Sequence, residues 1–268
     1  MNEQNFDYLR NQLKYTGFGD VLQRELRAKM SASPSNPAFT LLFRTLIGDD
    51  QAEAVLQFRK SEDSEMYFFN RYSLQLKNGQ GMDAHIQTYR INRENSITLK
   101  EAYNMLKGRA IYKEILPKDG EKYHAWLQLN LKETNEHGDF KTRQFHPNYG
   151  YDLKQILENF EIKELENPET AQALIRSLER GNRQAVSIRH EGKEEKMFIE
   201  ASPQYKSVNI YNNQQLRINL RSHGITKKEA QKQTGAEKET SDLDHPCNLS
   251  EQTNERKRRK RIRKLRIS

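Results

Sequence analysis

The segment LKGRAIYKEILPKDGEKYHAWLQLNL, residues 106–131, decides the fold of this chain. Two apolar runs are separated by Asp119 and Gly120, a pair that favours a tight turn because glycine tolerates a positive φ angle. In the second run apolar and polar residues alternate, which is typical of a strand with one buried face. The expected buried side is Tyr123, Ala125, Leu127, Leu129 and Leu131. The segment therefore predicts an antiparallel β-hairpin.

A similar arrangement recurs at Leu178–Ile199. There Gly181 corresponds to Gly108, and Gly192 with Lys193 corresponds to the turn at Gly120. Each unit is predicted to be a helix that ends in a leucine shortly before a basic residue and glycine, followed by a hairpin. Two interpretations stay open: an internal duplication, or independent use of a common helix–glycine–hairpin arrangement.

Upstream of the first unit, the pattern changes twice. Residues 6–13 and 22–30 carry apolar side chains at helical spacing, and Gly17-Phe18-Gly19 separates them, which predicts a helical hairpin. After a linker rich in Ser, Pro and Asn at 31–37, residues 38–92 contain alternating apolar segments divided by turn residues. This second region is expected to form an antiparallel meander.

Downstream of the first hairpin, the pattern predicts a third strand at 140–145 and helices at 152–160 and 167–181. Short apolar segments from Val186 to Ile218 are expected to complete another meander. The predicted fold class is therefore α+β, with an N-terminal helical hairpin, an antiparallel β-meander, two helix-plus-β-hairpin units and a disordered basic tail.

Composition restricts the class of protein. Only 34% of the 268 residues are hydrophobic and 31% are charged, so part of the chain is expected to lie outside any core. No apolar run approaches the roughly 20 residues of a membrane helix, and the first residues lack the character of a signal peptide; a cytoplasmic location is expected. The single cysteine, Cys247, cannot form an internal disulfide or supply a multi-cysteine zinc site.

Positive charge is concentrated at the C-terminal end. The last thirteen residues, 256–268, contain nine of the 45 basic residues and no acid, which leaves 36 basic and 37 acidic residues elsewhere. A net charge of +8 thus becomes −1 without this segment. Residues 221–255 are polar and lack apolar periodicity, which predicts a disordered linker. The expected divisions are 1–95, 96–220, 221–255 and 256–268.

Several short motifs are spread along the chain. They are NFDYL at 5–9, GFG at 17–19, MYFFN at 66–70, LKGRA at 106–110, QFHPNYG at 144–150 and GKEEKMFIEA at 192–201. Together they resemble the motifs of an uncharacterised family of bacterial accessory proteins carried on conjugative and mobilisable elements. The resemblance covers residues 1 to about 220. It implies a neighbourhood among DNA-transfer genes rather than a particular activity, and it brings no catalytic or binding residues with it.

The basic C-terminal segment is a candidate nucleic-acid-binding site. Its charge density suits contact with several phosphates, where counterion release supplies affinity without sequence preference. Arginine outnumbers lysine six to three, and its planar fork suits phosphates. The alternatives are a solvated end and a contact with anionic lipid. The nine residues are Arg256, Lys257, Arg258, Arg259, Lys260, Arg261, Arg263, Lys264 and Arg266.

Aromatic residues are candidates for a partner contact. Tyr67 and Phe69 lie in an aromatic strand that could stack on bases or on a protein, although a core strand is the favoured interpretation. Trp126 lies on the face of its strand that is expected to be polar. It is either exposed for a partner or covered by a helix such as 152–160, and the second is favoured.

Other sites are not indicated. The seven histidines show no helical metal-ligand spacing, and no phosphate loop or nucleophile motif is present; neither a metal, a cofactor nor an enzymatic activity is expected. The sequence favours an accessory factor of a mobile element that binds DNA or RNA through its tail and a protein through its body. The alternative is a protein-interaction module or inhibitor without a nucleic-acid role.

Overall fold

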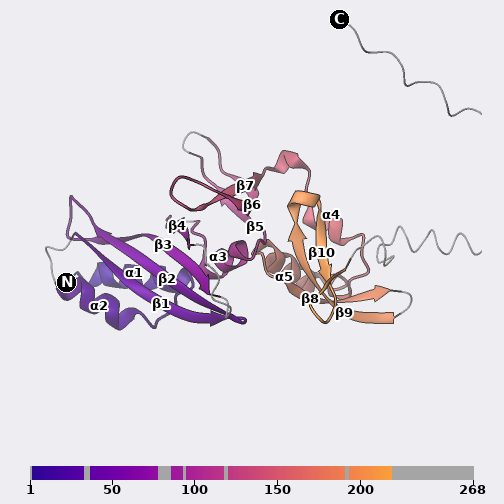
Figure 1. Ribbon diagram of the computed structural model, residues 1–268, viewed down its shortest axis with the longest axis horizontal. Helices are drawn as coiled ribbons and strands as arrows, with labels where there is room; N and C mark the ends of the chain where they lie inside the picture. The colour runs from indigo at the N-terminus through magenta and orange to yellow at the C-terminus, as the bar shows by residue number, and fades with distance from the viewer. Residues whose placement is uncertain are drawn as a thin grey trace, which may run out of the picture. The chain divides into compact units, whose positions relative to one another are not determined.

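The computed structural model describes residues 2–32, 37–77, 86–92, 95–117, 120–190 and 193–218. It shows an α+β chain, in which helices are combined with antiparallel sheets (Figure 1). Within the described residues the strands form sheets of four, three and four strands. The α+β class predicted from the apolar periodicity is confirmed.

Two helices begin the described chain, α1 (Glu3–Tyr15) and α2 (Gln23–Ala32). After α1 the backbone reverses at Gly17, whose φ angle of 93° is accessible to glycine. The N–H of Phe18 then donates to the carbonyl of Leu13 at 2.9 Å, which closes the helix end. This turn directs the Phe18 ring into the core, where the side chain is 1% exposed.

A four-stranded meander follows. Each strand pairs antiparallel with the next along the chain. In the second strand every other side chain is buried, as period-two patterning requires: Ala52, Ala54, Leu56 and Phe58. The strands are β1 (Ala38–Ile47), β2 (Asp50–Lys60), β3 (Tyr67–Lys77) and β4 (Ile86–Arg90).

An irregularity in β3 determines which aromatic rings are buried. The register between β2 and β3 shifts after Gln57, so that Asn70 has no partner in the β2 ladder. A bulge of this kind changes the parity of the strand. Phe69 and Tyr72 therefore face the same core, although a regular strand would put them on opposite faces.

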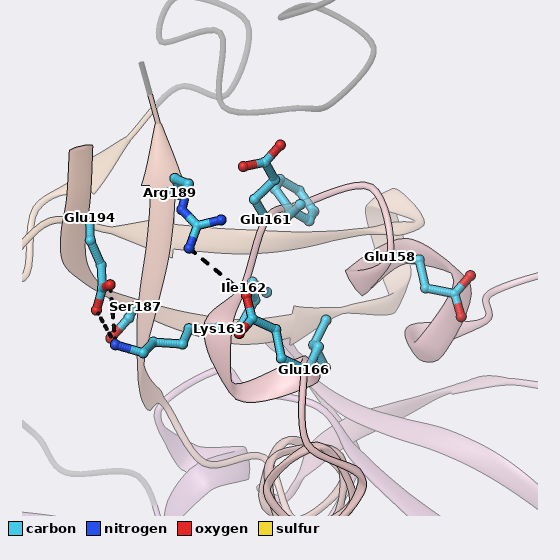
Figure 2. Close-up of a pocket in the computed structure, with 10 residues that line it drawn as sticks. Glu158, Glu161, Ile162, Lys163, Glu166, Ser187, Arg189 and Glu194 are labelled. Atoms are coloured by element: carbon cyan, nitrogen blue, oxygen red, sulfur yellow. Dashed lines mark hydrogen bonds and ion pairs between the residues drawn. The ribbon is translucent and has the colours of Figure 1, made fainter. Parts of the chain in front are cut away.

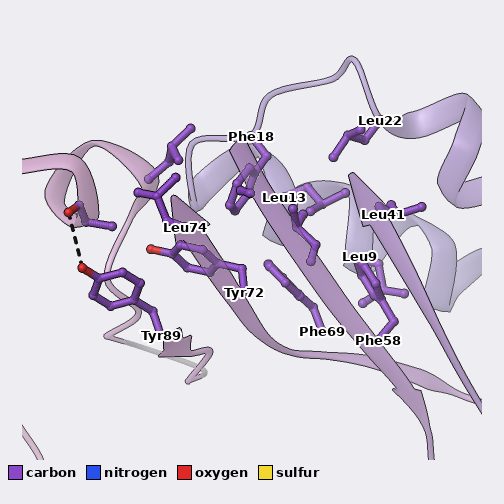
Figure 3. Close-up of a cluster of buried hydrophobic side chains, with 14 of the residues drawn as sticks. Leu9, Leu13, Phe18, Leu22, Leu41, Phe58, Phe69, Tyr72, Leu74 and Tyr89 are labelled. Atoms are coloured by element: carbon purple, nitrogen blue, oxygen red, sulfur yellow. Dashed lines mark hydrogen bonds between the residues drawn. The ribbon is translucent and has the colours of Figure 1, made fainter. Parts of the chain in front are cut away.

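The first cluster of buried side chains lies between this meander and the two N-terminal helices (Figure 3). Its aromatic rings form a continuous series of contacts: the Phe58 and Phe69 rings stack at 4.9 Å, and the Tyr72 and Tyr89 rings at 5.3 Å. The Tyr89 hydroxyl donates to the carbonyl of Ala102 at 3.3 Å, the bond dashed in Figure 3. This cluster is closely packed.

The next helix, α3 (Leu99–Leu106), belongs to the same cluster. Thr98 and Glu101 form a capping box at its start. Leu99, Ala102 and Met105 pack into the first cluster, so that the cluster extends past residue 95, where the sequence suggested a division.

The predicted hairpin of residues 106–131 is present as β5 (Ile111–Ile115) and β6 (Tyr123–Thr134), with β7 (Phe140–Phe145) as the third strand. The expectation of one buried face on β6 is wrong. Ala125 and Leu129 of one parity are buried, and so are Trp126 and Asn130 of the other. The strand is covered on both faces because the first cluster takes Leu129 and the second takes Trp126.

The second cluster is built from short helices against the last sheet. Leu157 from the first of these helices and Leu178 from the second are fully buried against Val186, Ile188 and Ile199. The elements are α4 (Leu153–Leu157), α5 (Pro168–Glu179), β8 (Gln184–His190), β9 (Lys193–Ser202), β10 (Ser207–Tyr211) and β11 (Arg217–Ile218), with 3₁₀ turns at Pro147–Tyr149, Lys163–Leu165 and Pro203–Tyr205. The sheet order is β11-β10-β9-β8.

The two helix–glycine turns have the same backbone geometry. Gly108 and Gly181 have φ angles of 77° and 76°. In both, the glycine N–H donates to the carbonyl three residues earlier, and the next N–H donates to the carbonyl five residues earlier, at 2.9 to 3.1 Å. Both helices are thus closed by the same left-handed turn. Whether the units arose by duplication stays a prediction.

Candidate aromatic pocket

A cavity of about 410 Å³ lies beside Trp126. Its walls come from strands β5 and β6, from the segment that joins β7 to α4, and from the end of α5. Aromatic rings and ionisable groups line the same space. The lining side chains used below are Tyr112, His124, Trp126, Tyr151, Asp152, Lys154 and Glu179.

The aromatic wall is set by strand register. Tyr112 on β5 pairs directly with Trp126 on β6, so both side chains project from the same face. Their ring centroids are 5.2 Å apart, and the His124 ring stacks on the Tyr112 ring at 5.3 Å. Tyr151 meets Trp126 edge to face at 5.3 Å. Four ring systems are therefore held together at contact distance.

Tyr151 is anchored from the opposite side. Its hydroxyl donates to the carbonyl of Ser207 at 3.1 Å and accepts the N–H of Ser202 at 3.2 Å. Burial raises the pKa of Tyr151 well above its ordinary value, so the phenol stays neutral. These bonds tie the pocket wall to strands β9 and β10, which makes it a rigid surface.

Glu179 is the last residue of α5 and is half-buried in the pocket. Burial raises the pKa of its carboxyl group above the ordinary value, while the nearby His124 and Arg176 lower it by a smaller amount. Among the described residues no side chain or backbone group forms a hydrogen bond or ion pair with this carboxylate. A partly desolvated acid without a partner is energetically unfavourable and is a marker of functional sites.

Asp152 provides a second carboxylate. Its side chain caps α4 by accepting the N–H of Gln155 at 3.1 Å. Tyr112 lines the same pocket as both acids. Burial raises the pKa of Tyr112, and the negative charges of Glu179 and Asp152 raise it further. The pocket thus combines aromatic faces, a phenol and two carboxylates, a set suited to a cation.

Figure 2 shows a second cavity, of about 430 Å³, around Ser187. Its two cations are already paired: the Lys163 ammonium lies 3.0 Å from Glu194, and the Arg189 guanidinium 3.9 Å from Glu166. Figure 2 shows both contacts as dashed lines. The basic groups of this cavity are therefore engaged with acids of the same cavity.

A larger cavity of about 720 Å³ lies where β4 and β5 come together. Its floor is apolar, with Ile97 and Met105 among the lining residues. The Lys113 ammonium, which also lines it, is paired with Glu101 at 2.9 Å. This cavity has space and apolar surface, but the charge on Lys113 is already satisfied.

The aromatic residues predicted as partner contacts lie in cores. Tyr67 and Phe69 are each 3% exposed in the first cluster, as the favoured core interpretation expected (Figure 3 labels Phe69). Trp126 is 5% exposed and shares the second cluster with Leu153 and Leu157 of α4, so it is covered as favoured. Tyr67 and Phe69 therefore present no free surface, whereas an edge of Trp126 reaches the pocket.

The nine basic residues Arg256, Lys257, Arg258, Arg259, Lys260, Arg261, Arg263, Lys264 and Arg266 lie outside the described residues. So do the linker at 221–255 and Cys247. In the described part of the chain, no group of three or more His, Cys, Asp or Glu side chains is arranged to hold a metal ion. No helix in that part is long and apolar enough to cross a membrane.

Sequence reasoning missed the acidic part of the pocket. Tyr112, Asp152 and Glu179 are far apart in the sequence, and none belongs to a spaced motif. The one available signal was Trp126, a large apolar residue at a polar position of its strand. Comparison of the chain with family models, with curated proteins and with solved structures found no match.

Proposed function

We propose that this chain is a non-enzymatic accessory protein with two separate contacts. The basic segment 256–268 binds nucleic acid without sequence preference, and the body binds a protein partner. The observation that carries the proposal is the distribution of charge: nine bases and no acid in thirteen residues, against a net charge of −1 for the remainder.

Affinity for nucleic acid follows from this distribution. Each phosphate that a basic residue neutralises releases counterions, which gives binding that weakens as salt rises. A nearly neutral body adds little to such a long-range attraction. The same charge partition leaves the body free for a contact of different chemistry, and the pocket at Trp126 offers aromatic and acidic groups for it.

The proposed setting is the cytoplasm of a bacterium that carries a conjugative or mobilisable element. The motifs that resemble accessory proteins of such elements support this setting. There, a protein that holds DNA or RNA by its tail brings its partner to the nucleic acid without itself catalysing a reaction.

A gel-shift titration tests the nucleic-acid contact. The full chain is compared with a chain ending at Glu255 and with a full-length variant in which the nine bases are glutamine. Both altered proteins are expected to lose binding to duplex DNA and to single-stranded RNA. The dependence of log affinity on log salt is expected to flatten, by roughly 0.9 for each phosphate of duplex DNA that is no longer neutralised. Binding by the glutamine variant as tight as that of the full chain would overturn the proposal.

A second function is favoured by the unpaired acid at Glu179. Here the body binds a protein in the cell and the chain has no nucleic-acid role, as a module or an inhibitor. A pull-down separates the two. Capture of the same partner after nuclease treatment and by the glutamine variant, together with no gel shift for the full chain, supports this second function.

A further inference from the structure

We propose that the pocket beside Trp126 binds the guanidinium side chain of an arginine in a partner polypeptide. The inference deepens the proposed function, because it rests on the body as the part that holds a protein and names the chemistry of that contact. It is carried by the arrangement of aromatic rings around a half-buried, unpaired carboxylate.

The charges in the pocket favour a cation. Glu179 is partly removed from water and has no partner among the described residues. An ion pair formed there would offset the unfavourable free energy of desolvating the carboxylate. Asp152 keeps one oxygen on the N–H of Gln155 and has a second oxygen with capacity to accept. The Lys154 ammonium also lines the pocket, but the two carboxylates outnumber it, so a cation is favoured over an anion.

The aromatic groups favour a flat cation. The Tyr112 ring centroid lies 5.3 Å from that of His124 and 5.2 Å from that of Trp126, and the face of a neutral aromatic ring attracts a positive charge. A guanidinium can stack on such a face and direct its N–H groups to a carboxylate at the edge, which an ammonium cannot do with the same geometry. Arginine therefore fits better than lysine.

The size of the cavity favours a side chain. Its volume of about 410 Å³ is near the lower end of the range for ligand sites, roughly 300–1,000 Å³. That space accommodates one long side chain and part of its backbone, but no helix or strand. The pocket is also open on one side, since His124, Asp152 and Lys154 are exposed, so the chain that carries the arginine can continue into solvent.

Binding is expected to weaken in acid. The other titratable groups that line the pocket are Tyr112 from β5, His124 from β6, and His146, Tyr151, Asp152 and Lys154 from the segment that leads into α4 and from the start of that helix. Arg176 acts on Glu179 from its own helix. Only the ionised carboxylate pairs with a cation, and burial raises the pKa of Glu179 above its ordinary value. Affinity for arginine is therefore expected to fall as pH drops through this raised value.

The chain contains its own probe for this site. Trp126 is the single tryptophan, so tryptophan emission reports on this pocket alone. The full chain is titrated with acetyl-Gly-Arg-Gly-amide, with the same tripeptide carrying uncharged citrulline, and with agmatine as a free guanidinium compound. A saturable change with the arginine tripeptide and none with citrulline is expected.

The variant Glu179→Gln keeps the shape and removes the charge, and it is expected to weaken tripeptide binding roughly tenfold or more. Glu169→Gln, an exposed acid in the first turn of the same helix, is the matched control and is expected to leave binding unchanged. Thermal unfolding monitored by circular dichroism verifies that both variants fold. Equal responses to arginine and citrulline tripeptides, or an unchanged affinity in Glu179→Gln, overturn the inference.

The source of the guanidinium and the parent proposal are tested separately. Tripeptide binding at least as tight as agmatine binding supports a polypeptide ligand, and tighter binding of agmatine overturns that part. A gel shift is run on the same variants, and Glu179→Gln is expected to bind DNA normally. If the unaltered chain gives no response to the arginine tripeptide but a normal gel shift, the pocket alone is rejected. If the unaltered chain responds to the tripeptide but gives no gel shift, the tail alone is rejected.

Discussion

The two helix–glycine–hairpin units share one backbone geometry but carry different side chains at the helix end. The first unit runs from α3 to β6. The residue two positions before its glycine is Leu106, which packs against the first cluster. In the second unit, α5 to β9, the same position is Glu179, which faces the aromatic pocket. A helix end that is closed by an apolar side chain in one unit is left with a half-buried acid in the other.

This difference separates a residue that stabilises the fold, Leu106, from a residue that we assign to ligand binding, Glu179. Leucine at a helix end buried against a sheet stabilises the fold, and α3 is buried along most of its length. Glu179 breaks that local rule without a compensating partner among the described residues. Local rules are most often broken at functional sites, which is why the comparison directs attention to the second unit.

The largest expected effect tests whether the buried ends of α3 and α5 contribute equally to the stability of the fold. Met105 and Leu178 occupy equivalent positions three residues before glycine and are 1% and 0% exposed. Met105→Ala and Leu178→Ala are each expected to lower the free energy of unfolding by about 2–5 kcal/mol, because each leaves a cavity in a closed core. Urea denaturation measures both. A loss below about 1 kcal/mol for Leu178→Ala would contradict the equivalence of the two helices.

A smaller effect separates the two glycines. Alanine at either position is strained, since both have a positive φ angle, at a cost of about 1–2 kcal/mol. At Gly181 the added Cβ would also lie 2.9 Å from the carbonyl oxygen of Ala110, whereas at Gly108 the nearest atom is the flexible Leu131 side chain at 3.5 Å. Gly181→Ala is therefore expected to destabilise the protein more than Gly108→Ala, by about 1 kcal/mol or more.

Thermal melts of the two alanine variants, supported by urea denaturation, make this comparison directly. Asparagine at each position is the control, because its side chain tolerates the left-handed conformation better than alanine does. It is expected to recover part of the loss at Gly108 and little of it at Gly181, where the contact with backbone persists. Equal losses for the two alanine variants would show that strain in φ alone determines the cost.

The sequence predicted those parts of the fold that depend on local periodicity. Alternation of apolar and polar residues within 38–92 predicted the meander that contains β2, because alternation is a property of neighbouring residues. The bulge at Asn70 was not predictable, since it is a feature of the pairing between β2 and β3 and not of neighbouring residues in the sequence. The second buried face of β6 was missed as a whole, although Trp126 indicated it.

The site was less predictable than the fold. Tyr112, Asp152 and Glu179 come together only when the β5–β6 pairing and the packing of α5 are both in place. Neither their residue types nor their spacing marks a ligand site. The nine basic residues at 256–266 show the opposite case: their chemistry is clear from composition, and their contacts lie outside the described residues.

The smallest effect concerns the acid itself and has an unusual sign. The folded-state pKa of Glu179 is raised above its ordinary value, so the folded protein favours the protonated form. Stability is therefore lost as pH rises from the ordinary carboxyl range through the raised value. Glu179→Gln is expected to stabilise the protein at pH 7, by about 0.5 kcal/mol or less, because the group is half-exposed and solvent screens the effect.

Glu169 in the first turn of α5 gives the matched contrast. An acid at a helix N-terminus is favoured by the helix dipole, so Glu169→Gln is expected to destabilise the protein by about 0.3–1 kcal/mol at low salt. Urea denaturation at pH 7 and at pH 3 measures both. The gain from Glu179→Gln is expected to vanish at pH 3, where the wild-type carboxyl is protonated in the folded and unfolded states. A loss of stability at pH 7 would mean that the carboxylate is paired, and the distinction between Leu106 and Glu179 would then be one of packing alone.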